Sequence, residues 1–143
     1  MKLLTKSINE ALLRNGRIRA ALEEDGRAEA DFIPVVKLFT PDAGCTWLLT
    51  ELDPDEPDIA FGLCDLGMGC PELGSVYLCE LEAVRGVLGL PVERDLHFDP
   101  DFTISVYARA ALKAGRIVED RASLEQALTE QREARQIAEG GAP

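Results

Sequence analysis

The sequence predicts a single α+β domain built on an antiparallel β-meander of about five strands, with helices covering one face of the sheet. Three observations support this fold class. Short apolar runs alternate with turn residues in the middle of the chain, stretches with helical spacing flank them, and 143 residues suit one domain with its own core. The predicted strands are 34–39, 46–52, 59–65, 74–79 and 92–98, and the predicted helices are 7–24, 80–88, 103–114 and 123–138.

The first helix is expected to begin where Ser7 and Glu10 have the spacing of a capping box. Asn15-Gly16 is a stop or kink signal inside it, and the polar segment 23–31 is typical of a linker into the sheet. We therefore divide the chain into a helical arm, an α+β core, and a C-terminal helix with a frayed tail. These parts comprise residues 1–30, 31–120 and 121–143.

The central strands are predicted from short apolar runs separated by turn residues. The turn at residues 40–44 joins the first two strands into a hairpin, and Trp47 is expected to be a core anchor because a lone tryptophan in a strand usually packs. From Ile59 onward, large residues alternate with small ones, and Gly62 and Cys64 indicate close packing against a neighbouring segment.

The segment between Glu51 and Asp65 contains carboxylates and no basic residue. The two prolines in residues 53–58 prevent regular strand pairing and favour an exposed loop. The alternate carboxylates resemble the start of a calcium-binding EF-hand loop, but Asp58 and Cys64 stand where that loop needs glycine and glutamate. We therefore expect a solvated acidic turn, with no metal and no cofactor.

In the second half of the core, side chains alternate again between two faces of a predicted strand from residue 92 to residue 98. This places Arg94 on an apolar face, where its charge needs a carboxylate or a backbone carbonyl, and we expect a structural ion pair. The next helix should end at Gly115. Ser123 and Gln126 form a second capping box. The apolar face of that last helix thins toward its end, so it is either loosely held or a surface for homo-oligomer formation.

The composition of the chain limits the kinds of partner that it can bind and the compartment in which it is expected. The formal net charge of −11 repels phosphate backbones, which argues against direct nucleic-acid binding. No apolar run reaches the roughly 18 residues that a membrane crossing needs, and the N-terminus lacks the features of a signal peptide, so we expect a cytoplasmic protein without membrane contact. In such a compartment cysteines stay reduced, and we expect free thiols. The cysteines are Cys45, Cys64, Cys70 and Cys79.

Three stretches taken together resemble a bacterial family of unknown function. They are VVKLFTPD, TWLLTELDPDEPDIAFGLCDLGMGCPELG and LPVERDLHFDPD, and the resemblance covers about residues 30–120. Members of that family resemble small proteins carried on plasmids, integrative elements and phages. The resemblance implies a role in mobile-element biology, such as maintenance, transfer or evasion of host defence, and it offers no established activity, catalytic residue or cofactor to carry over to this chain.

Three hypotheses for function follow. The first is a non-catalytic accessory module of a mobile element that binds a basic partner protein, with a DNA mimic that blocks a host restriction enzyme as a sharper variant. The second is a small enzyme, whose candidate groups would have to converge in one pocket. The third is a subunit active only in an assembly. The partner-binding candidates are Glu51, Asp53, Asp55, Glu56 and Asp58, and the enzymatic candidates are Glu51, Glu72, Asp95 and His97.

Overall fold

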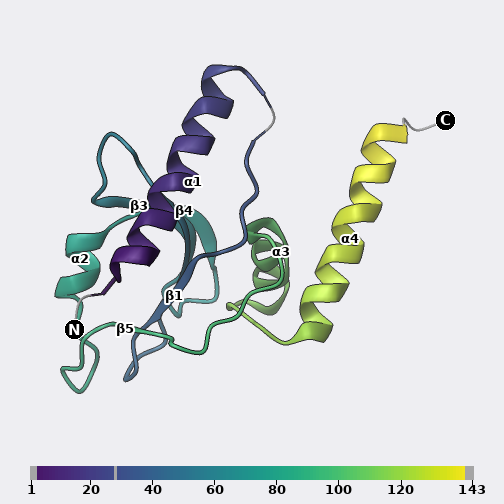
Figure 1. Cartoon of the computed structure of the whole chain (residues 1–143). Helices are drawn as coiled ribbons and strands as arrows, with labels where there is room; N and C mark the ends of the chain where they lie inside the picture. Colours follow the sequence, from purple (N-terminus) through teal and green to yellow (C-terminus); the bar gives the residue numbers. More distant parts are fainter. Residues whose placement is uncertain (1–2, 28, 141–143) are drawn as a thin grey trace.

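The computed structural model describes residues 3–27 and 29–140, and it confirms a single-domain α+β fold with a five-stranded antiparallel sheet (Figure 1). The elements are α1 (Lys6–Glu24), β1 (Val36–Phe39), β2 (Thr46–Leu52), β3 (Ile59–Asp65), β4 (Glu72–Tyr77), α2 (Leu78–Ala83), β5 (Glu93–Arg94), α3 (Ile104–Ala114) and α4 (Arg121–Gly140). None of the helices in this described part of the chain combines the length and the apolar character that crossing a membrane requires.

The strand order is β4-β3-β2-β1-β5, so the first four strands form a meander and β5 lies at the far edge beside β1. The predicted strand 92–98 is much too long. The chain turns directly after β5, because Asp95 Oδ1 accepts a hydrogen bond from His97 N at 2.8 Å. Arg94 Nη1 donates to the carbonyl oxygen of Leu3 at 2.8 Å, so a backbone carbonyl serves as a partner for this charge.

Helices cover both faces of the sheet, which corrects the expectation that they cover one. On one face, Leu12 of α1 packs with Trp47 and Leu49, and Trp47 is buried as predicted. On the other face, Leu48 packs with Tyr107 of α3. Consecutive leucines in β2 are both fully buried because neighbouring side chains point to opposite faces of a sheet.

Helix α1 runs without a break through Asn15-Gly16, so the predicted stop signal is wrong. Both residues serve contacts with β2. Asn15 Nδ2 donates to the carbonyl oxygen of Thr50 at 2.9 Å, and a Cβ atom on Gly16 would collide with the carbonyl oxygen of Leu52. The N-cap of the helix is Thr5, whose Oγ1 accepts from Ile8 N at 3.2 Å, and not the predicted Ser7.

Several other boundaries differ from the prediction. Helix α2 ends at Ala83 because Val84 is extended, with φ −64° and ψ 137°. Helix α4 begins earlier than the predicted capping box, since Asp120 Oδ2 accepts from Ser123 N at 2.9 Å. Helix α3 ends at Gly115 as predicted, where φ is 77° and glycine carries no steric penalty. In Figure 1, α4 lies beside α3 and away from the sheet.

Candidate functional site

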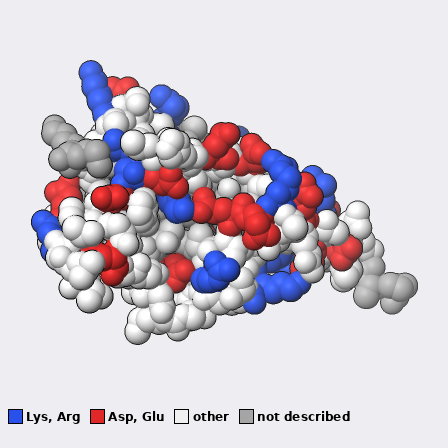
Figure 2. All heavy atoms as spheres, turned by 90° about the horizontal axis from the view of Figure 1, so that it is seen from below, with Lys and Arg blue, Asp and Glu red and all other residues white. Residues whose placement is uncertain are grey.

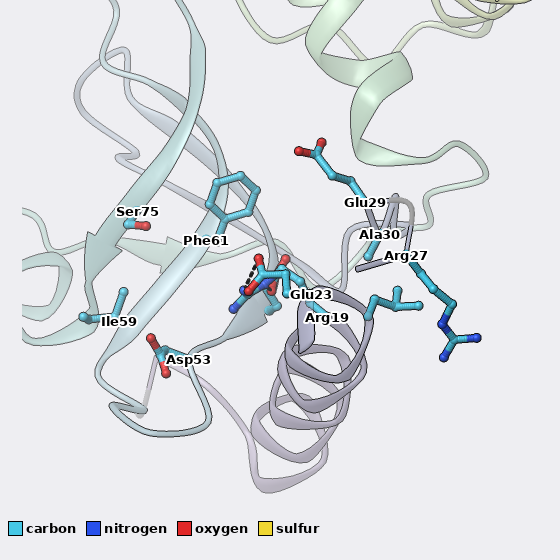
Figure 3. A pocket seen from close by; sticks show the side chains of 11 residues that line it. Arg19, Glu23, Arg27, Glu29, Ala30, Asp53, Ile59, Phe61 and Ser75 are labelled. Carbon is cyan, nitrogen blue, oxygen red and sulfur yellow. Dashed lines mark hydrogen bonds and ion pairs between the residues drawn. The ribbon is translucent and has the colours of Figure 1, made fainter. Parts of the chain in front are cut away.

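A cavity of about 400 Å³ lies next to the acidic loop, which we define as residues 53–58. It is bounded by the C-terminal half of α1, the segment that follows α1, and the strands β2, β3 and β4 (Figure 3). Its volume falls in the range of pockets that hold small ligands or single side chains. The lining residues are Arg19, Leu22, Glu23, Arg27, Glu29, Ala30, Glu51, Asp53, Ile59, Phe61 and Ser75.

A β-bulge directs Glu51 into this cavity. The register between β2 and β3 shifts between Leu49 and Glu51, so that Glu51 lies opposite Phe61. Inserting one residue in a strand reverses the faces of the residues after it. The bulged Thr50 is held on both sides, because its hydroxyl donates to the carbonyl oxygen of Phe61 at 3.2 Å and its own carbonyl accepts from Asn15.

Glu51 differs from the carboxylates of the acidic loop because it is buried, with 3% of its surface exposed. Arg19 Nε donates to Glu51 Oε2, and Arg19 Nη1 donates to Glu23 Oε1 at 3.0 Å. Burial raises the pKa of Glu51, and Arg19 opposes part of that rise. Burial alone would lower the pKa of Arg19, but its hydrogen bonds and attraction to Glu51 and Glu23 raise it. Glu51, a partner-binding candidate from the sequence, is therefore buried and paired with Arg19 inside the fold.

The cavity retains a surplus of negative charge. Its lining includes four carboxylates and two guanidinium groups. Arg19 is engaged by the two glutamates described above, and Arg27 Nη2 pairs with Asp25 Oδ2 at 3.2 Å. An apolar wall formed by Leu22, Ile59 and Phe61 adjoins these charges. The arrangement suits a group with an apolar stem and a positive head.

The acidic loop itself is an ordered turn. Asp53 Oδ1 accepts from the backbone N–H groups of Asp55 and Glu56, at 2.9 and 3.3 Å. Asp58 Oδ1 accepts from Cys79 N at 3.2 Å, at the start of α2. Asp55 and Glu56 are exposed, and within the described residues their carboxylates make neither a hydrogen bond nor an ion pair. These two carboxylates of the acidic loop are accessible to a partner.

The enzymatic candidates do not converge. Glu72 begins β4 and Asp95 follows β5, so they lie at opposite edges of the sheet, roughly 19 Å apart at about 4.8 Å per strand. Asp95 pairs with Lys37 at 3.4 Å, and His97 is exposed. Of the four candidates, only Glu51 lines the cavity.

The cysteines are all unpaired. Cys45 and Cys64 are partly buried, while Cys70 and Cys79 are exposed. Burial, with a smaller effect from Glu72, raises the pKa of Cys64, which makes its thiol less reactive. In the described ranges, no three His, Cys, Asp or Glu side chains lie close enough together to hold a metal ion.

Several cavity residues were not candidates from the sequence: Arg19, Glu23, Phe61 and Ser75. The i,i+4 spacing of Arg19 and Glu23 is visible in the sequence, but it indicates only a helix-surface ion pair. Their contact with Glu51 depends on the tertiary arrangement, so local spacing does not reveal it.

A family model described as "Protein of unknown function (DUF2958)" matches residues 3–118. The match includes the whole sheet, α1, α2 and α3, and therefore both the acidic loop and the cavity. No curated protein and no solved structure matches the chain.

Proposed function

We propose that this chain, which belongs to the DUF2958 family of proteins of unknown function, is a non-catalytic binding module that holds a basic segment of a partner protein. The observation that carries the proposal is the position of Asp55 and Glu56. Both are exposed, both lack partners within the described residues, and their loop adjoins a cavity with surplus carboxylates.

The physical basis is electrostatic attraction followed by burial of a side-chain stem. A net charge of −11 attracts a basic segment, and the acidic loop gives that attraction a definite place. One lysine or arginine side chain can lay its aliphatic stem against Phe61 and Ile59, with its charged head near Glu23 and Asp53.

The proposal has two variants, an accessory module of a mobile element and a DNA mimic, which differ in the biological setting of the protein. The sequence resemblance supports an accessory role on a mobile genetic element. A DNA mimic would need carboxylates at phosphate-like spacing along an extended surface. The exposed carboxylates beside the cavity, Asp55 and Glu56 of the acidic loop and Glu29 after α1, instead surround one pocket, and this favours a basic peptide segment. The enzyme hypothesis gains no support, because Asp95 and His97 lie together at one edge of the sheet, away from Glu72 and from the cavity that Glu51 lines.

The test measures binding of a fluorescent hexa-arginine peptide by anisotropy at low salt. The double variant Asp55→Asn, Glu56→Gln removes two charges without touching the hydrogen bonds of Asp53 or Asp58. We expect its Kd to rise about fivefold to tenfold, which corresponds to about 1 to 1.4 kcal/mol. Added salt should weaken wild-type binding because it screens exposed charges.

The matched control is Glu133→Gln, Glu139→Gln on the exposed part of α4, which makes the same change in net charge. It should bind the peptide like the wild type. An equal loss in both variants would show that net charge alone attracts the peptide. An unchanged Kd in the loop variant would contradict the proposed site.

A further inference from the structure

Strand β4 forms an open edge of the sheet. It pairs with β3 on one side and is the outermost strand in the order β4-β3-β2-β1-β5. None of its six residues is buried, and Leu73 and Tyr77 are 43% and 44% exposed. An edge strand of this kind presents a row of backbone groups with which another extended segment can pair.

The pairing with β3 determines which backbone groups of β4 point outward. Along an antiparallel pair of strands, hydrogen-bonded and non-hydrogen-bonded residue pairs alternate. Asp53 N donates to the carbonyl oxygen of Ile59 at 2.9 Å, so the backbone of Ile59 faces β2, and Tyr77 opposite it is in a non-hydrogen-bonded pair. The N–H and C=O groups of Leu73, Ser75 and Tyr77 therefore point away from β3. They make no backbone hydrogen bond to another segment of the described residues.

This edge lacks the features that commonly prevent an edge strand from pairing with another chain, which are a lysine, a proline or a bulge. The sequence of β4 is ELGSVY, and its register with β3 is continuous along the whole strand. Its single charged residue, Glu72, is acidic and exposed. The edge is therefore available for pairing, and its own charge favours a basic segment.

The edge also continues the row of side chains that lines the cavity. Residues directly opposite each other on paired strands place their side chains on the same face of the sheet. Glu51 lies opposite Phe61, Phe61 lies opposite Ser75, and all three line the cavity. A residue opposite Ser75 on an added strand would be the next in this row. Because the serine side chain is small and exposed, a long side chain at that position can extend over it toward Phe61.

The charges identify the occupant of the edge as a basic segment. The sequence has no Lys or Arg from residue 51 to residue 84, which includes β3, β4 and α2. On the face shown in Figure 2, by contrast, Lys and Arg side chains lie among the Asp and Glu side chains. The acidic loop adjoins the C-terminal end of β4, where Leu78 N donates to the carbonyl oxygen of Asp58 at 2.8 Å. A segment that pairs with β4 therefore meets the acidic loop and the cavity together.

We infer that the basic segment of the partner binds as an added β-strand along β4, with every second side chain directed toward the cavity. This inference rests on the proposed function and deepens it, because backbone pairing fixes the conformation and register of the segment that the acidic loop attracts. A second copy of the chain is a poorer occupant, since its own β4 carries Glu72 and no basic residue. The partner segment is expected to alternate Lys or Arg with uncharged, strand-favouring residues such as Thr or Val.

The test measures the fluorescence anisotropy of a labelled peptide, Arg-Thr-Arg-Thr-Arg-Thr, and of two modified forms of it. One form is N-methylated at its arginines and the other at its threonines. Alternate backbone N–H groups of a strand point to opposite sides, so only one of the two sets can pair with β4. We expect one methylated peptide to bind at least about tenfold more weakly than the unmodified peptide, and the other to bind like it.

Ser75→Pro makes the matching change in the protein. It removes an outward N–H group and leaves the hydrogen bonds to β3 in place, which is where an edge strand tolerates proline. We expect the Kd for the unmodified peptide to rise about fivefold to tenfold. Val87→Pro is the control and should bind normally. Val87 is 87% exposed in the turn that Gly89 N closes on the carbonyl oxygen of Gly86 at 3.0 Å, at a position that favours proline. Circular dichroism checks the folding of both variants.

The outcomes separate this inference from the proposed function. Strand addition is overturned if Asp55→Asn, Glu56→Gln weakens binding while Ser75→Pro and both methylated peptides leave it unchanged, and the acidic site then stands. A loss in Ser75→Pro with no loss in the loop variant would retain the edge and contradict the acidic loop. Absence of peptide binding to the wild type would overturn both. A wild-type dimer that Ser75→Pro converts to a monomer, measured by sedimentation velocity, would assign the edge to a second copy and overturn the inference.

Discussion

Tyr107 illustrates at the residue scale how burial controls ionisation. Its side chain lies in the core between α3 and the sheet. Burial, together with smaller effects from the charges of Glu119, Asp101 and Asp99, raises the pKa of its hydroxyl from 10.0 to about 12. The folded protein therefore keeps this proton at a pH where the unfolded chain has lost it.

The prediction concerns stability in alkaline solution. Between pH 10 and 12 the unfolded state releases the Tyr107 proton and the folded state does not, so the free energy of unfolding falls as pH rises. Tyr107→Phe should remove this contribution. Urea unfolding at several pH values should give a steeper loss for the wild type than for the variant over this range. Parallel slopes, or ionisation of Tyr107 near pH 10 in the folded state, would contradict the account.

The carboxylates from Glu51 to Asp58 show which properties of the site residues could be predicted from the sequence. Two prolines made the exposure of Asp55 and Glu56 predictable, because they exclude regular strand pairing. The burial of Glu51 was not predictable, since it depends on a bulge at Thr50 and on a cation from α1 that is distant in sequence. Alternation alone cannot locate such a bulge.

At the element scale, the packing of α1 on β2 depends on one missing side chain. Gly16 in the middle of α1 leaves no room for a Cβ beside the carbonyl oxygen of Leu52. Gly16→Ala should therefore lower the free energy of unfolding by about 1–3 kcal/mol. The loss is expected although alanine is favoured over glycine in a helix by about 1 kcal/mol. Urea denaturation followed by circular dichroism measures it.

Arg17→Ala at the next, exposed position serves as the control and should change stability little. A more stable Gly16→Ala variant would mean that helix propensity outweighs the contact with β2. That result would contradict the close approach of α1 to the sheet.

Elements bounded by strong local signals were predictable. The ranges of β2 and β3 were predicted correctly, because their apolar runs are bounded by proline, aspartate and glycine. The predictions failed where tertiary contacts override local preference. Asn15-Gly16 lies inside α1 because both residues contact β2, and β5 is short because the Asp95 side chain turns the chain. The position of β5 beside β1 is a long-range pairing that local pattern does not encode.

At the scale of the whole molecule, the sheet separates two surfaces of different chemistry. The acidic loop and the cavity lie at one end, and the exposed side chains of Leu66 and Met68 lie at the other. Binding of a basic segment at the acidic loop should weaken as salt is added, because salt screens the attraction between opposite charges.

The central claim is that a basic segment binds at the acidic loop and its cavity. Two-dimensional ¹H–¹⁵N NMR during titration with hexa-arginine tests it most directly. The account predicts concentrated shift changes in residues 19–27, 51–61 and 75, with residues 41–44, 66–70 and 86–91 unaffected. Shift changes concentrated in residues 41–44, 66–70 and 86–91 or along α4, or spread evenly over all acidic residues, would contradict it.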